Sequence, residues 1–127
     1  MSSWTDSITA ITLFVDDLAA AKTFYTETFD LPVDFADDDS AVFKFGGTLI
    51  NLLKATAARE LISPAPVASQ EAGNRFQLTL HVADVDALCD KLRSKGVTLL
   101  NGPIDRPWGP RTACFQDPGG HIWEIAS

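Results

Sequence analysis

The side chains best suited to chemistry in this 127-residue chain fall at equivalent positions of an internal duplication. Residues 11–18, ITLFVDDL, match residues 78–85, LTLHVADV, at an offset of 67 positions. Residues 46–52, GGTLINL, match residues 119–125, GGHIWEI, at an offset of 73 positions. A duplicated domain often places its site where the two copies face each other. Four equivalent positions would meet there, and they are Ala10, Asn51, Gln77 and Glu124.

Four strands must position these side chains, because alternate residues of a strand point to the same face. The expected strands are residues 8–15, 48–54, 76–82 and 121–126, and each carries one of the four positions. Phe14 shares a face with Ala10, and His81 shares a face with Gln77 about 13 Å along the strand. If these faces form a cleft, it holds one carboxylate, two amides, a distal histidine and an apolar lining.

Helices and further strands complete two copies of a strand–helix–strand–strand–strand unit. Asp17 is expected to cap a helix over residues 18–29, and Asp84 to cap one over residues 85–95 that Gly96 ends. The remaining strands are predicted at residues 32–36, 40–45, 98–100 and 112–116. We interpret the chain as one domain with module 1 at about 6–54, a connector at 55–74 and module 2 at about 75–127. The connector has room for a short helix around residues 57–61 and for a cover over the site.

Composition excludes several function classes. The net charge of −7 and the isoelectric point near 4.5 argue against nucleic-acid binding, which needs clustered Lys and Arg, and lean weakly towards cationic or neutral ligands. No apolar run is long enough for a membrane span, and the first residues lack the features of a signal peptide, so a cytoplasmic location is expected. Cys89 and Cys114 form no C-x-x-C pair and are interpreted as two buried free thiols.

The order of these motifs resembles the vicinal oxygen chelate (VOC) superfamily, also called the glyoxalase/bleomycin-resistance/dioxygenase family. The matching stretches are VDDL at 15–18, FY at 24–25, LHVADVD at 80–86, WGPR at 108–111 and DPGGHIWE at 117–124. The resemblance implies an α+β fold with two βαβββ modules, each curling a mixed sheet around a cleft. It also implies a homodimer, because members are commonly dimers.

The resemblance also implies where a metal would bind. Metal-dependent members place His, Gln or Glu seven residues before each motif aspartate, and Glu on the last strand of a module. The corresponding positions here are Ala10, Gln77, Asn51 and Glu124. Only Glu124 is a strong ligand, so the set is poor for Zn²⁺ or Fe²⁺ and tolerable for Mn²⁺ or Mg²⁺. We therefore expect no cofactor; a divalent metal (Mn, Mg, Ni, Fe or Zn), if bound, would use Gln77, Glu124 and Asn51.

Each candidate has a functional and a structural interpretation. Glu124 either acts as a general base, holds a ligand, or accepts a structural hydrogen bond from Asn51 or Gln77. His81 either contacts the far end of a ligand or packs at the end of its strand. Trp108 either stacks on a planar ligand or packs in its loop. Arg111 either pairs with an anion or is a surface arginine.

Two clusters are given a structural interpretation only. His121 follows DPGG and is expected to pack in a turn. The acidic run at 37–39 lacks the spacing of a calcium loop and predicts a solvated hairpin turn.

The favoured function is binding or sequestration of a drug or metabolite in the cleft, similar to the bleomycin-resistance branch, with a degenerate metal site. The alternative is a metal-dependent VOC enzyme, namely a lyase, isomerase, dioxygenase or thiol transferase acting on a small oxygenated substrate. A protein-interaction module is a third possibility. The sequence does not decide whether the protein is catalytic.

Overall fold

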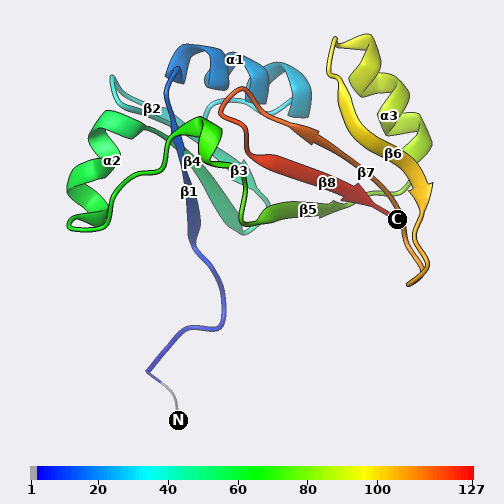
Figure 1. Ribbon diagram of the computed structural model, residues 1–127, viewed down its shortest axis with the longest axis horizontal. Helices are drawn as coiled ribbons and strands as arrows, with labels where there is room; N and C mark the ends of the chain where they lie inside the picture. Colours follow the sequence, from blue (N-terminus) through cyan, green and yellow to red (C-terminus); the bar gives the residue numbers. More distant parts are fainter. Residues whose placement is uncertain (1–2) are drawn as a thin grey trace. The chain divides into compact units, whose positions relative to one another are not determined.

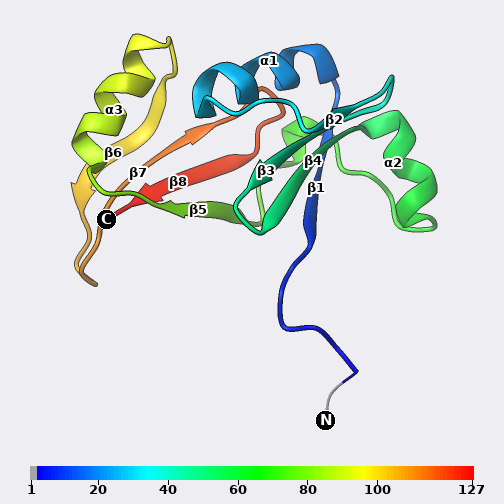
Figure 2. The same cartoon turned by 180° about the vertical axis from the view of Figure 1, so that it is seen from behind.

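The computed structural model describes residues 3–127 and divides the chain into two compact units, Met1–Ala68 and Ser69–Ser127. The division falls inside the connector expected at residues 55–74. Each unit is a four-stranded mixed sheet with a helix packed on one face, an α+β architecture that agrees with the predicted fold class (Figures 1 and 2).

Unit 1 has the element order β1 (Ala10–Val15), α1 (Leu18–Phe29), β2 (Phe35–Ala36), β3 (Ser40–Phe45), β4 (Thr48–Lys54) and α2 (Ala55–Ile62). Its strands lie in the order β1-β4-β3-β2, with β1 and β4 parallel and the other pairs antiparallel. Asp17 caps α1 by accepting a hydrogen bond from the amide of Ala20 at 3.0 Å, as the sequence predicted.

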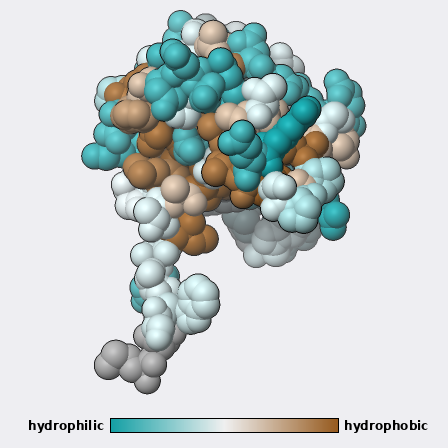
Figure 3. Space-filling view, turned by 90° about the vertical axis from the view of Figure 1, so that its left-hand side faces the viewer, coloured by the Kyte–Doolittle hydropathy of each residue, from teal (hydrophilic) through white to brown (hydrophobic). Residues whose placement is uncertain are grey.

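The core of unit 1 lies between α1 and one face of its sheet. Alternate strand residues, including Leu13, Phe43 and Leu52, are fully buried there, and the Tyr25 ring lies 5.6 Å from the Phe43 ring. The opposite face of the sheet carries Ala10, Thr12 and Phe14 of β1, and we call it the open face of unit 1; α2 contacts β1 and β4. Seen from the side of α2, the surface shows hydrophobic residues among hydrophilic ones (Figure 3).

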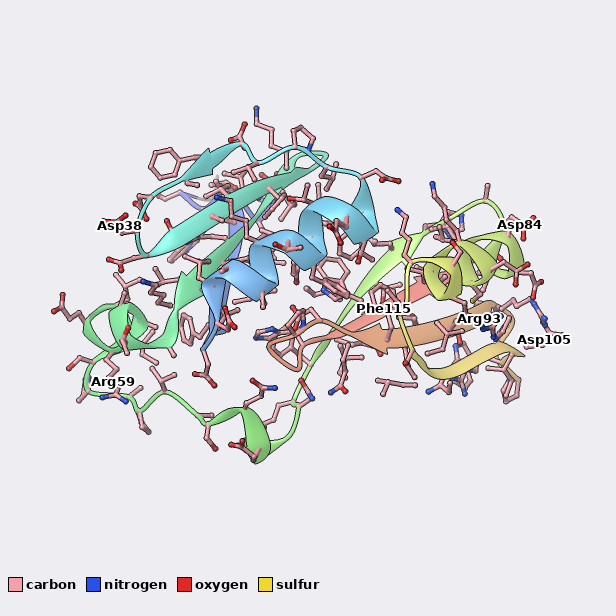
Figure 4. All side chains as sticks on the ribbon, turned by 90° about the horizontal axis from the view of Figure 1, so that it is seen from above. Asp38, Arg59, Asp84, Arg93, Asp105 and Phe115 are labelled. Atoms are coloured by element: carbon pink, nitrogen blue, oxygen red, sulfur yellow. The ribbon has the colours of Figure 1, made fainter. Side chains whose placement is uncertain are left out.

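Unit 2 repeats this order with η1 (Gln70–Ala72), β5 (Gln77–His81), α3 (Val85–Ser94), β6 (Leu99–Asp105), β7 (Arg111–Gln116) and β8 (Ile122–Ala126). Its strands lie in the order β5-β8-β7-β6, again with the first pair parallel. Asp84 caps α3 through the amide of Ala87 at 3.0 Å, and Asp84 and Arg93 mark the two ends of this helix (Figure 4). Cys89, Phe115 and Trp123 are buried between α3 and the sheet.

Three predicted elements differ from the structure. The strand predicted at 32–36 is reduced to Phe35–Ala36, and the helix predicted at 57–61 runs over Ala55–Ile62. The strand predicted at 98–100 extends over Leu99–Asp105, across Gly102 and Pro103. Gly102 and Pro103 are tolerated in β6 because it is an edge strand with two register shifts against β7. Such a strand does not need a backbone N–H donor at every position. No helix among residues 3–127 is long and apolar enough to cross a membrane.

Candidate functional site

A row of polar side chains crosses the face of the unit 2 sheet that α3 does not cover, and we call this the open face of unit 2. The register pairs Thr79 of β5 with Glu124 of β8, Glu124 with Cys114 of β7, and Cys114 with Asn101 of β6. Directly paired residues of neighbouring strands point to the same side of a sheet. The row therefore presents hydroxyl, carboxylate, thiol and amide groups side by side.

Glu124 is half-buried in this row and accepts a hydrogen bond from the Thr79 hydroxyl at Oε1, at 3.1 Å. The structural interpretation expected the donor to be Asn51 or Gln77, and the structure shows Thr79 instead. The reason is the parallel register of β5 and β8, which places Thr79 directly opposite Glu124 and Gln77 opposite Ile122. Thr79 is the only partner of this carboxylate among residues 3–127.

Gln77 and His81 lie on the same face as Thr79, at the two ends of β5, and both are exposed. His81 is paired in register with Ala126, one row from Glu124. This position is compatible with both roles considered for His81, namely contact with the far end of a ligand and packing at the end of its strand. The second histidine, His121, instead packs in the β7–β8 turn, as expected, where its Nδ1 lies 3.0 Å from both oxygens of the buried Asp117 carboxylate.

Arg106 is a residue that sequence reasoning missed. Its Nε donates to Thr112 Oγ1 at 2.8 Å and its Nη2 donates to Asn101 Oδ1 at 3.1 Å. Both acceptors lie on the open face of unit 2, so the guanidinium lies over β6 and β7, and Thr112 is left only 1% exposed. The RPWGPR segment at 106–111 was a signal, because it combines an arginine with the stiff turn residues that can fold it back over the sheet.

Trp108 lies in the β6–β7 turn and is 72% exposed. The turn is closed by hydrogen bonds from the Arg106 amide to the Pro110 carbonyl at 2.8 Å and from the Gly109 amide to the Arg106 carbonyl at 3.0 Å. The Arg106 guanidinium lies 5.8 Å from the indole centroid, a cation–π contact. The indole therefore contacts Arg106 and remains accessible to solvent.

Arg111 has partners other than the anion that the functional interpretation proposed. It forms a bidentate pair with Asp86 of α3, with both N–O distances 2.9 Å, and its Nη1 donates to Asp105 at 3.0 Å; Asp105 lies at the end of β6 (Figure 4). These hydrogen bonds lower the pKa of Asp86 and raise that of Arg111. Arg111 therefore ties α3 to the β6–β7 hairpin, a partnership between distant segments that spacing does not reveal.

The open face of unit 1 is more apolar. Ala10, Thr12 and Phe14 of β1 lie opposite Leu49, Asn51 and Leu53 of β4, in that order. Asn51 donates from Nδ2 to Thr12 Oγ1 at 3.5 Å, while its buried Oδ1 has no hydrogen-bond partner among residues 3–127. Phe14 is half-buried beside Leu53. Asn51 therefore lies among apolar residues on this face, with Leu49 and Leu53 on the same strand.

The two cysteines differ in environment. Cys89 belongs to α3 and is buried, and this burial raises the pKa of its thiol. Cys114 is half-buried and lies beside Glu124 on the open face of unit 2, so the interpretation of both thiols as buried is wrong for Cys114. The difference arises because residue 114 alternates with the buried residues 113 and 115 along β7.

The donor chemistry fits a divalent metal poorly. Within unit 1, Ala10 has no donor and Asn51 offers only a neutral amide; within unit 2, Gln77 offers an amide and Glu124 a carboxylate. Tight catalytic sites for zinc or iron use three ligands drawn from His, Cys and carboxylate. Among residues 3–127, no group of three His, Cys, Asp or Glu side chains is arranged to hold a metal ion.

Comparisons with known proteins agree with this architecture. The model of the Glyoxalase/Bleomycin resistance protein/Dioxygenase superfamily matches residues 7–125. The uncharacterized protein YraH of Bacillus subtilis is 34% identical over 119 residues, which cover 91% of this chain and 93% of that protein.

Solved structures are similar over nearly the whole chain. A glyoxalase/bleomycin resistance protein/dioxygenase from Nocardioides has a TM-score of 0.87 at 25% identity, covering 98% of this chain and 85% of that one. A glyoxalase-related enzyme from Fulvimarina pelagi has a TM-score of 0.83 at 26% identity, covering 96% and 88%. Lactoylglutathione lyase from Agrobacterium tumefaciens has a TM-score of 0.77 at 21% identity, covering 96% and 93%, a likeness of fold.

Proposed function

We propose that this chain, which belongs to the Glyoxalase/Bleomycin resistance protein/Dioxygenase superfamily, binds a small organic molecule and retains it without transforming it. The observation that carries the proposal is the environment of Glu124. A half-buried carboxylate lies in the middle of an uncovered sheet face, with one hydrogen bond from Thr79. Such a group is available to a ligand that carries a hydrogen-bond donor or a positive charge.

The β6–β7 turn of unit 2 also supports a binding role. Its Trp108 is exposed and contacts Arg106, which suits the indole to stack on a planar part of a ligand. The net charge of −7 favours the approach of cationic or neutral molecules over anions. A drug or metabolite with an amino or hydroxyl group beside an aromatic portion satisfies both conditions.

The chemistry of the donors favours binding over metal-assisted turnover. The enzyme alternative gives Glu124 the role of ligand or base, with Gln77 and Asn51 completing the set. Two neutral amides and one carboxylate, with alanine at the fourth position, form a weak set for a catalytic metal. The family resemblance to enzymes therefore supports the fold and the position of the site, and the residues themselves support retention of the ligand.

Thermal-shift screening with a panel of cationic and neutral drugs and metabolites tests the proposal. A ligand that binds the folded state raises the melting temperature according to its concentration and dissociation constant. We expect Glu124→Gln to weaken binding of any hit about tenfold, equivalent to about 1.4 kcal/mol. Asp38→Asn, which removes one negative charge from an exposed turn of unit 1, is the matched control and should leave binding unchanged.

Mass spectrometry of the recovered ligand separates the two functions. Recovery of the unchanged compound in stoichiometric amount supports retention. Conversion of the compound by the wild type and not by Glu124→Gln would support the enzyme alternative and overturn the proposal. Equal binding by the wild type and Glu124→Gln would show that this face is not the site.

Two finer properties belong to the same proposal. A homodimer is expected from the superfamily resemblance, and light scattering of the purified protein at twice the mass of the 13.7 kDa chain would support it. A cytoplasmic location is part of the same proposal, and fractionation of cells expressing the protein tests it.

A further inference from the structure

Two oppositely charged groups lie on the open face of unit 2 without being paired to each other. Glu124 accepts its one hydrogen bond from Thr79, and Arg106 donates to the neutral side chains of Thr112 and Asn101. Neither charge has an ion-pair partner among residues 3–127. Both side chains are half-buried, and a ligand with two opposite charges can supply a partner to each of them.

The register sets the spacing of the strands that carry the two charges. Glu124 lies on β8, and Asn101, which accepts from the Arg106 guanidinium, lies on β6, with Cys114 of β7 between them. Two strand spacings separate Glu124 from Asn101, roughly 10 Å between backbones. Cys114 is small, uncharged and half-buried, which suits it to contact a short apolar chain.

Arg106 has the remaining donor capacity to bind an anion. A guanidinium carries five N–H groups, of which Nε and Nη2 each make one hydrogen bond here. Nη1 makes no hydrogen bond within the described part of the chain. The two existing bonds and the stacking against Trp108 hold the guanidinium in place, so less entropy is lost when an anion binds.

We propose, building on the function proposed above, that the open face of unit 2 selects an amphoteric ligand, with a protonated amine at Glu124 and a carboxylate at Arg106. Arg106 is the residue that sets this specificity. Ligands with two amines or two carboxylates at the same spacing are rejected, because one of their ends meets a like charge.

A matched set of small probes tests this ligand class. We suggest titrating ¹⁵N-labelled protein with 6-aminohexanoate, hexylamine and hexanoate, and following the amide shifts of β5, β7 and β8 by NMR. 6-Aminohexanoate should bind about fivefold to tenfold more tightly than hexylamine, and hexanoate should bind most weakly. Glycine, which cannot span two strand spacings, should bind no better than hexanoate.

Variants assign each end of the probe. Arg106→Gln should reduce the affinity for 6-aminohexanoate to that of hexylamine and leave the affinity for hexylamine unchanged. This second measurement also shows that the variant still folds. Arg106→Lys keeps the charge and should give an intermediate affinity, because lysine loses the forked geometry. Glu124→Gln should weaken both amine-containing probes.

Three results would overturn the inference. The first is equal affinity of the wild type for hexylamine and 6-aminohexanoate, the second is unchanged affinity in Arg106→Gln, and the third is no detectable binding of 6-aminohexanoate. If hexylamine binds in a Glu124-dependent manner without any gain from the carboxylate, only this inference fails and the proposed function stands. If Glu124→Gln changes the affinity of no probe and of no hit from the drug panel, both this inference and the proposed function fail.

Discussion

Substitution of Gly102 by alanine tests the geometry that holds the Arg106 end of the site. Gly102 follows Asn101 in β6 and has φ +89°, and a Cβ built there would lie 2.4 Å from the Thr112 carbonyl oxygen and 2.6 Å from Ala113 Cα. Both atoms are backbone, so no rotamer change relieves the overlap, and β6 must move away from β7. Gly96 is a matched control, because its φ is +84° and a Cβ there would meet nothing within 4 Å.

The magnitude follows from two separate contributions. An alanine at positive φ lowers the free energy of unfolding by about 1–2 kcal/mol. The reduced freedom of the unfolded chain offsets about 0.4–1 kcal/mol of this loss, and both contributions apply equally to Gly96→Ala and Gly102→Ala. Overpacking adds about 1–3 kcal/mol at Gly102 alone. For a chain of this length 1 kcal/mol corresponds to about 3–5 °C, so Gly102→Ala should melt about 3–15 °C below Gly96→Ala.

Circular dichroism melts of the wild type and the two variants measure this difference. The larger loss should be accompanied by weaker binding of ligands to the Arg106 end, because Asn101 moves with β6. Melting temperatures of the two variants that agree within about 1 °C would refute the close approach of β6 to β7 at Gly102.

Three further predictions concern other parts of the structure. Hydrogen bonds from Arg111 lower the pKa of Asp86 below 3.8, so the ionised carboxylate stabilises the folded protein above that pH. Asp86→Asn should therefore reduce the free energy of unfolding above pH 3.8, and the difference from the wild type should disappear as the pH falls through the lowered pKa. Urea titrations at several pH values measure this difference. A thiol reagent such as DTNB should label the half-buried Cys114 in the folded protein and the buried Cys89 only after unfolding, so labelling of Cys89 first would contradict the placement of both residues. Protein purified without chelator and offered Mn²⁺, Ni²⁺ or Zn²⁺ should retain well under one equivalent, and mass spectrometry showing one equivalent that Glu124→Ala removes would contradict this.

The sequence predicted the parts of the fold that depend on neighbouring residues. Alternating apolar residues located β1 and β4, and Asp17 and Asp84 located the first turns of α1 and α3. These signals are local, because a strand face and a helix cap are set within a few residues. The length of β6 was missed, because Gly102 and Pro103 end a strand by local rules and are tolerated only at a sheet edge.

The strand faces of the candidate residues were predictable from the sequence, and the contacts of their side chains were not. Parity along each strand placed Glu124, Gln77 and His81 on one face. The partner of Glu124 depends on which residue of β5 lies opposite, and the sequence does not set the register of two strands that are 45 residues apart. For the same reason the partnership of Arg111 with Asp86, and the position of Arg106 over the sheet, became visible only in the structure.

The two duplicated units differ in the polar residue that pairs with the threonine of the first strand, and the charged residue lies in unit 2. Each unit pairs a threonine on its first strand with a polar residue directly opposite on its last strand, Thr12 with Asn51 and Thr79 with Glu124. In unit 1 the amide donates to the threonine, leaving a buried carbonyl oxygen without a partner, whereas in unit 2 the threonine donates to the carboxylate. The threonine hydroxyl can serve both pairs because it is both donor and acceptor. The same backbone arrangement thus carries a neutral, apolar surface in unit 1 and a charged surface in unit 2. A ligand that needs a carboxylate partner should therefore bind to unit 2. Glu124→Gln tests this, because it gives unit 2 an amide at the position where unit 1 already has one.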